Sequence, residues 1–143
     1  MFEYKIKIYE DRTEWYNLKG QLHREGGPAI EYANGTKFWY LNGKCHREGG
    51  PAVEYTDGTK RWYLNGQLHR KDGPATEYTD GTKYWYLNGQ RHREGGPAME
   101  YTNNDKSWYL NGKEYTETEF NKKTGKGCPE TITINGTKYQ KIK

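Results

Sequence analysis

The chain has 143 residues, a net charge of +4 and a mean hydropathy of −1.31, and aromatic residues make up 15% of it. This length predicts one domain, residues 1–143, and the charge is too small for a dedicated nucleic-acid binder. The first residues show no charged segment followed by an apolar one, so we expect no signal peptide, and we find no apolar run that could span a membrane and no metal-ligand spacing around the two cysteines. We therefore expect a cytoplasmic protein with reduced thiols and no cofactor.

Residues 1–15 predict an N-terminal strand and cap. Apolar and charged residues alternate from Met1 to Glu10, which is typical of a strand with one apolar face. The segment from Tyr9 to Leu18 predicts a degenerate hairpin with its turn at Asp11 and Arg12.

Residues 16–115 predict repeats of 23 residues. One motif, Trp-Tyr-Leu-Asn-Gly, recurs at this spacing, and a second, His-Arg-x-x-Gly-Pro-Ala, recurs in step with it. The first motif begins at Trp39, Trp62, Trp85 and Trp108, and the second begins at His23, His46, His69 and His92. A fixed period of this length predicts stacked supersecondary units.

Each repeat predicts two strands joined by Asp-Gly or Asn-Gly, which favours a two-residue type I′ turn. That turn would place Glu54 opposite Arg61. Alternation would then put Trp62 and Tyr55 on one face of the sheet, and Arg61, Glu54 and Tyr63 on the other. The position of Arg61 varies most between repeats, which makes this second face directional; its occupants are Trp15, Phe38, Arg61, Tyr84 and Ser107.

Residues 116–143 predict a C-terminal cap. Thr116 followed by Glu119 forms a capping box, which predicts a short helix to about Lys123. A loop from Gly125 to Pro129 and a closing hairpin over 131–142 follow. The sequence thus predicts an all-β fold: an elongated, twisted antiparallel meander of hairpin repeats with a short C-terminal helix and a closing hairpin.

The pattern Trp-Tyr-x-Asn-Gly-x-x-His-Arg-x-x-Gly-Pro-Ala, over roughly residues 9–115, identifies a resemblance to the MORN repeat. It resembles more closely the repeat proteins of bacteriophages and large DNA viruses that carry this pattern. MORN-type proteins are mostly scaffolds and interaction modules, so the resemblance implies a binding role. The viral likeness implies an inhibitor or adaptor, encoded by a phage or mobile element, that acts on a host protein such as a component of bacterial defence.

The tyrosines of the repeat are candidate partner-binding residues. They are Tyr40, Tyr63, Tyr86 and Tyr109. Tyrosine supplies contact area at protein interfaces, and nucleic-acid bases could also stack on it. The alternative is that this face is half-solvated, with rings that only cover the sheet backbone.

The His-Arg row is the second candidate binding surface. It consists of His23, His46, His69 and His92 with Arg24, Arg47, Arg70 and Arg93. Its cations could steer an acidic protein surface or follow a nucleic-acid backbone. The structural alternative is that each histidine packs on a tryptophan or caps its own loop while each arginine pairs with a nearby acid. Those acids are Glu25, Glu48, Asp72 and Glu94.

The tryptophans predict a structural ladder, formed by Trp39, Trp62, Trp85 and Trp108. A single-layer sheet has nothing obvious to cover them, so we expect loops, coiling of the sheet or a homodimer to do so.

Catalysis finds little support, because the single serine, Ser107, has no fixed partner and repeated histidines cannot converge on a metal. We expect a non-enzymatic protein-binding module. The alternatives are a nucleic-acid or anionic-ligand binder and a structural spacer.

Overall fold

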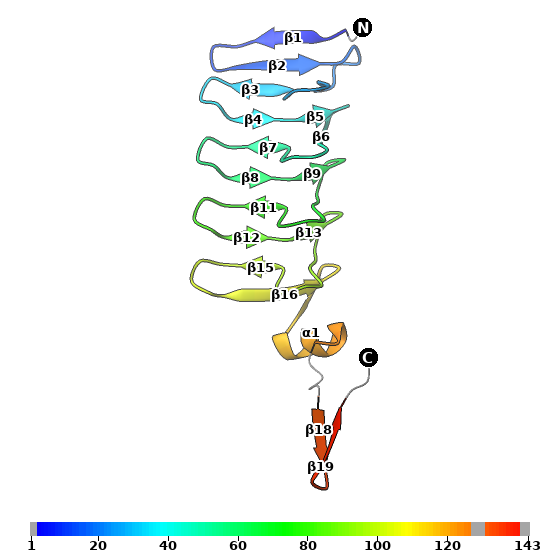
Figure 1. The fold of residues 1–143 in the computed structure, drawn as a ribbon. Coiled ribbons are helices and arrows are strands. Elements are labelled where there is room, and N and C mark those ends of the chain that lie inside the picture. Colours follow the sequence, from blue (N-terminus) through cyan, green and yellow to red (C-terminus); the bar gives the residue numbers. More distant parts are fainter. Residues whose placement is uncertain (1–2, 127–130, 141–143) are drawn as a thin grey trace.

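A computed structural model of the chain describes residues 3–126 and 131–140 and confirms an all-β hairpin repeat (Figure 1). The strands of the main sheet are β1 (Lys5–Ile8), β2 (Arg12–Tyr16), β3 (Ile30–Tyr32), β4 (Lys37–Phe38), β7 (Val53–Glu54), β8 (Lys60–Arg61), β11 (Thr76–Glu77), β12 (Lys83–Tyr84), β15 (Met99–Glu100), β16 (Lys106–Leu110) and β17 (Lys113–Tyr115). They follow one another in this order across an 11-stranded antiparallel sheet. The sheet is therefore the expected meander.

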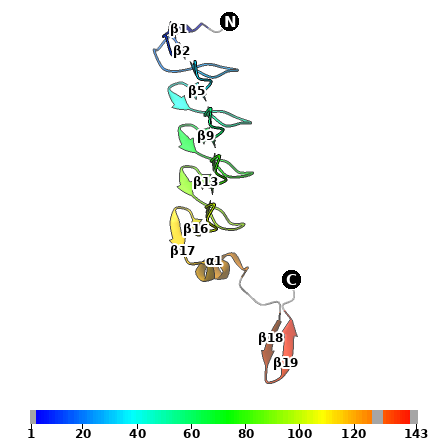
Figure 2. The same ribbon diagram turned by 90° about the vertical axis from the view of Figure 1, so that its left-hand side faces the viewer.

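Each inner repeat adds a small second hairpin beside the main sheet. These hairpins are β5 (Tyr40–Leu41) with β6 (Lys44–Cys45), β9 (Tyr63–Leu64) with β10 (Gln67–Leu68), and β13 (Tyr86–Leu87) with β14 (Gln90–Arg91). An irregular loop then returns the chain to the main sheet. Figure 2 shows the successive repeats, with their small hairpins, stacked one above the next.

The register of the main hairpin differs by one residue from the expected one. Arg61 lies opposite Val53, and Glu54 lies opposite Lys60, so the predicted pairing of Glu54 with Arg61 is wrong. Tyr55 N–H donates to the carbonyl of Thr59 over 3.0 Å, which leaves three residues in the turn. Arg61 consequently shares a face with Tyr55 and Val53, and Trp62 lies on the opposite face with Glu54.

The side chain of Asp57 supports this three-residue turn. Its Oδ1 accepts a hydrogen bond from Thr59 N–H at 2.7 Å, and Gly58 takes the left-handed conformation with φ 89°. This geometry suits a type I turn followed by a bulge, in which only the glycine needs a positive φ.

The type I′ geometry occurs instead in the small hairpins. Asn65 and Gly66 both have positive φ, 52° and 82°, and Leu64 lies opposite Gln67. Asparagine and glycine tolerate this conformation better than other residues, which accounts for the Asn-Gly pair at this place in the four repeats that follow the first.

Trp15 occupies the tryptophan position of the first repeat. Its N–H donates to Ala29 O at 2.8 Å, as Trp39 N–H donates to Ala52 O at 2.8 Å. The expected grouping of Trp15 with Phe38 and Arg61 is therefore wrong by one residue. Glu14, which lies opposite Ile30 as Phe38 does, fills that position.

The core is a thin column, as the composition requires. One alanine per repeat is fully buried: Ala29, Ala52, Ala75 and Ala98. Val53 and Met99 are also buried, whereas the tryptophans and tyrosines of the repeats are half-buried. Each repeat is therefore stabilised mainly by its contacts with the repeats on either side.

The C-terminal cap agrees with its sequence signals. Helix α1 (Glu117–Thr124) begins with the predicted capping box of Thr116 and Glu119, is followed by the C-cap Gly125, and buries Phe120. It contacts β16 and β17. Strands β18 (Thr131–Ile134) and β19 (Thr137–Gln140) form the predicted hairpin.

Some expectations fall outside the described residues. They concern the start of the N-terminal strand at residues 1–2, the loop residues 127–130 with Cys128, and the chain end at 141–143. Within residues 3–126 and 131–140, no helix is long and apolar enough to cross a membrane.

Candidate functional site: two faces of the repeat sheet

Each of the four arginines of the His-Arg row covers one tryptophan, and among the described residues no arginine lies over Trp108. Each guanidinium carbon lies 3.7–4.0 Å from the centroid of an indole ring. The pairs are Arg24 on Trp15, Arg47 on Trp39, Arg70 on Trp62 and Arg93 on Trp85. We call the side of the sheet that carries these pairs the loop face. Cation–π contact of this kind holds each loop against the sheet.

The same arginines form ion pairs within the loop face. Arg70 donates to Pro74 O at 3.1 Å and to Glu77 Oε1 at 2.6 Å. The other three arginines do the same, with Glu31, Glu54 and Glu100 as the acids. The expectation that they pair with Glu25, Glu48, Asp72 and Glu94 is therefore wrong: the acid is on the next strand, seven residues after the arginine.

The histidines link consecutive repeats. Nδ1 of His46 accepts a hydrogen bond from the backbone N–H of Asn65 at 3.1 Å, and the other three histidines repeat this bond with Asn42, Asn88 and Asn111. The expectation that each histidine caps its own loop is wrong, because the acceptor serves the turn of the following repeat. Within the described part of the chain, no group of three or more His, Cys, Asp or Glu could hold a metal ion.

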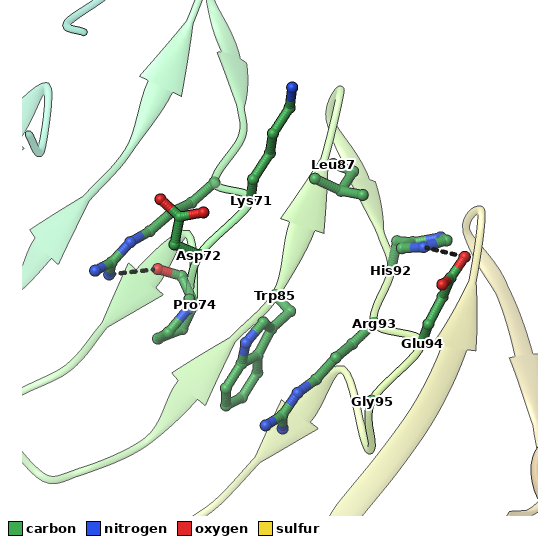
Figure 3. A pocket seen from close by; sticks show the side chains of 11 residues that line it. Lys71, Asp72, Pro74, Trp85, Leu87, His92, Arg93, Glu94 and Gly95 are labelled. Atoms are coloured by element: carbon green, nitrogen blue, oxygen red, sulfur yellow. Dashed lines mark hydrogen bonds and ion pairs between the residues drawn. The ribbon is translucent and has the colours of Figure 1, made fainter. Parts of the chain in front are cut away.

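Hollows open between successive loops of this face. One of about 690 Å³ is lined by Trp85, Leu87 and the loops that carry Asp72 and Glu94. Figure 3 shows Trp85 lying between the Lys71–Pro74 segment and Arg93. Arg70 in these walls donates to Pro74 O at 3.1 Å, and Arg70 and Arg93 pair with Glu77 and Glu100. The two arginines that line the hollow therefore already have acidic partners.

The opposite side of the sheet, which we call the tyrosine face, carries two rows of side chains. The turn-side row, nearest the Asp-Gly turns, consists of Tyr32, Phe38, Tyr55, Arg61, Tyr78, Tyr84 and Tyr101, and the hairpin-side row consists of Tyr40, Tyr63, Tyr86 and Tyr109. The predicted grouping of Tyr63 with Glu54 is wrong, because the observed register brings Tyr63 to the face of Tyr55.

The turn-side row is a run of edge-to-face aromatic contacts. Successive ring centroids lie 5.4–5.9 Å apart, at Tyr32–Phe38, Phe38–Tyr55, Tyr78–Tyr84 and Tyr84–Tyr101. Arg61 bridges the two halves of the run, with its guanidinium carbon 5.5 Å from the Tyr55 ring and 6.0 Å from the Tyr78 ring. Such contacts stabilise rings that are only half-buried.

The hairpin-side row is also half-buried, and burial raises the pKa of Tyr40 and Tyr63. Arg91 donates to the hydroxyls of Tyr86 and Tyr109, both at 3.3 Å. Burial raises the pKa of the Cys45 thiol, which lies beside this row, to about 12. The thiol therefore stays protonated, and unreactive as a nucleophile, at neutral pH.

Arg61 and Arg91 differ from the arginines of the loop face. Among the described residues, neither forms an ion pair with a carboxylate, and Nε of Arg61 is buried without a hydrogen-bond partner. Neither is among the site residues predicted from the sequence, although the position of Arg61 varies most between repeats. The available signal was their departure from the repeat, since Tyr84 stands where Arg61 does and Leu68 stands where Arg91 does.

Comparisons of the chain with protein-family models, with curated proteins and with solved structures gave no match. The likeness to MORN-type and viral repeat proteins accordingly stays a proposal carried by the motifs of the chain.

Proposed function

We propose that the chain is a non-enzymatic binding module that contacts a partner protein through the tyrosine face. The observation that supports this is the pair of half-buried aromatic rows on the tyrosine face. They lie on a sheet whose contacts mostly join neighbouring strands. Tyrosine and arginine are enriched where protein interfaces are strongest. Their rings are fixed by their neighbours, so little side-chain entropy would be lost on binding.

The loop face makes a weaker candidate. Its arginines already have acidic partners, as the pair of Arg70 with Glu77 shows. A partner-binding role for the His-Arg row stays a prediction, and so does the alternative of nucleic-acid binding through it. The narrower setting, an inhibitor or adaptor that acts on a host defence protein, rests on the resemblance to viral repeat proteins.

Affinity capture from a bacterial lysate tests the proposal. The bait is the intact chain, compared with the double variant Tyr63→Ala/Tyr86→Ala on the tyrosine face. Leu64→Ala/Leu87→Ala is the matched control, because these neighbouring side chains lie on the loop face. Circular dichroism first establishes that all three proteins are folded.

We expect a partner that the intact chain and the leucine variant retain and the tyrosine variant loses. Capture of the same partner by the tyrosine variant would show that the partner binds a surface other than the tyrosine face. Capture of nothing by any bait would favour the spacer alternative.

A further inference from the structure

Arg61 and Arg91, which have no carboxylate partner among the described residues, both lie on the tyrosine face, in adjacent repeats. Arg61 belongs to the turn-side row, between Tyr55 and Tyr78, and Arg91 lies beside Tyr86 and Tyr109 of the hairpin-side row. Both side chains are half-buried. They are therefore held in place by rings and hydroxyls and not by a carboxylate.

We propose that the part of the tyrosine face around Arg61 and Arg91 binds a carboxylate-rich segment of a partner protein. The proposal rests on the proposed function and names the chemistry of the partner. Binding would supply each guanidinium with the acidic partner that the described residues do not give it.

Charge complementarity favours an acidic occupant. The glutamates of strands β3, β7, β11 and β15 lie on the loop face, bound to its arginines: Glu31, Glu54, Glu77 and Glu100. The tyrosine face between Phe38 and Tyr109 thus presents arginines and phenol groups without these carboxylates. Planar guanidinium groups held by neighbouring rings suit bidentate carboxylate recognition.

A protein segment fits this face better than a nucleic acid. Bases would need open ring faces to stack on, but the turn-side rings already meet one another edge to face, at 5.4 Å for Tyr78 and Tyr84. A nucleic-acid backbone would also need a longer track of unpaired cations than Arg61 and Arg91 provide.

The repeats themselves supply variants that should fold. Arg61→Tyr introduces the residue that Tyr84 provides in the next repeat, and Arg91→Leu introduces the residue that Leu68 provides in the preceding one. The double variant R61Y/R91L removes both cations with side chains that this sheet already accommodates. Lys60→Gln/Lys83→Gln is the matched control: it removes two exposed positive charges from the loop face.

The test measures binding of a fluorescent polyglutamate peptide of about ten residues, long enough when extended to cross about three repeats. Fluorescence anisotropy gives its Kd for the intact chain, R61Y/R91L and K60Q/K83Q. We expect R61Y/R91L to weaken binding about tenfold, and K60Q/K83Q to change it less than about twofold.

Equal affinity of all three proteins for the peptide, or no binding by the intact chain, would overturn the inference. So would tighter binding of single-stranded oligo-dT than of the peptide, with the same sensitivity to R61Y/R91L. A partner captured from lysate and lost by Tyr63→Ala/Tyr86→Ala would keep the proposed function even then, so the two failures are distinguishable.

Discussion

The two faces of the sheet use arginine in opposite ways. On the loop face, Arg70 stacks on Trp62, bonds Pro74 and pairs with Glu77, and the same set recurs in four repeats. On the tyrosine face, Arg61 lies between rings with no carboxylate beside it among the described residues. The arginines that recur in each repeat are thus neutralised by partners within the chain. Arg61, which departs from the repeat, keeps a positive charge that another molecule could bind.

The comparison is tested most strongly by Arg70→Ala. This change removes the stacking on Trp62 at 3.9 Å, the hydrogen bond to Pro74 and the ion pair with Glu77. We expect the free energy of unfolding to fall by about 2 kcal/mol, as measured by urea denaturation. Lys71→Ala is the control, because this neighbouring side chain is exposed; an equal loss in both variants would contradict the structural role of the loop-face arginines.

A second test concerns the link between repeats at Asn88. Its φ of 49° is left-handed, and its N–H donates to Nδ1 of His69 at 3.1 Å. We expect Asn88→Ala to lower the free energy of unfolding by about 1 kcal/mol, because alanine tolerates this conformation poorly. Asn88→Gly should lose less, and a larger loss for glycine than for alanine in urea melts would show that φ is not the cause.

A third test uses the burial of Cys45 beside the tyrosines. Burial raises the pKa of its thiol from 9.0 to about 12, so the folded chain retains a proton that the unfolded chain releases in this range. Stability should therefore fall as pH rises from 9.0 toward about 12. Cys45→Leu, which copies Leu68, removes this contribution.

We expect thermal unfolding to show a smaller loss of Tm for Cys45→Leu than for the intact chain between about pH 8 and about pH 11. Tyr40, Tyr63 and Tyr84, whose pKa burial also raises, to about 12 for Tyr84, are present in both proteins and contribute to the shared part of the loss. Identical pH profiles would mean that the Cys45 thiol is not protected by folding.

The smallest effect is expected for Arg61→Tyr. A tyrosine there would join Tyr55 to Tyr78 in the edge-to-face arrangement that Tyr84 makes with Tyr78. We expect the free energy of unfolding to rise, by less than about 1 kcal/mol, in urea melts. A loss as large as that of Arg70→Ala would show that Arg61 is structural, and the contrast between the two faces would disappear.

The stacked hairpins, their spacing and the C-terminal helix could be predicted from the amino-acid sequence alone. These follow from local signals: a 23-residue period, turn residues at fixed places, and the capping box of Thr116 and Glu119. Such signals act through a few neighbouring residues, so they can be recognised without knowledge of what packs against them.

Which side chains share a face, and which charged groups pair, could not be predicted without the folded structure. An Asp-Gly pair suits turns of two or three residues, and the choice at Asp57 and Gly58 moved Arg61 to the side of Tyr55. The acid that neutralises Arg70 lies on the next strand, and the acceptor for Asn65 N–H is His46 of the preceding repeat. These partners lie on neighbouring strands or repeats, so they depend on how the repeats stack. The register depends on contacts across neighbouring strands, which outweigh the small local difference between turn types.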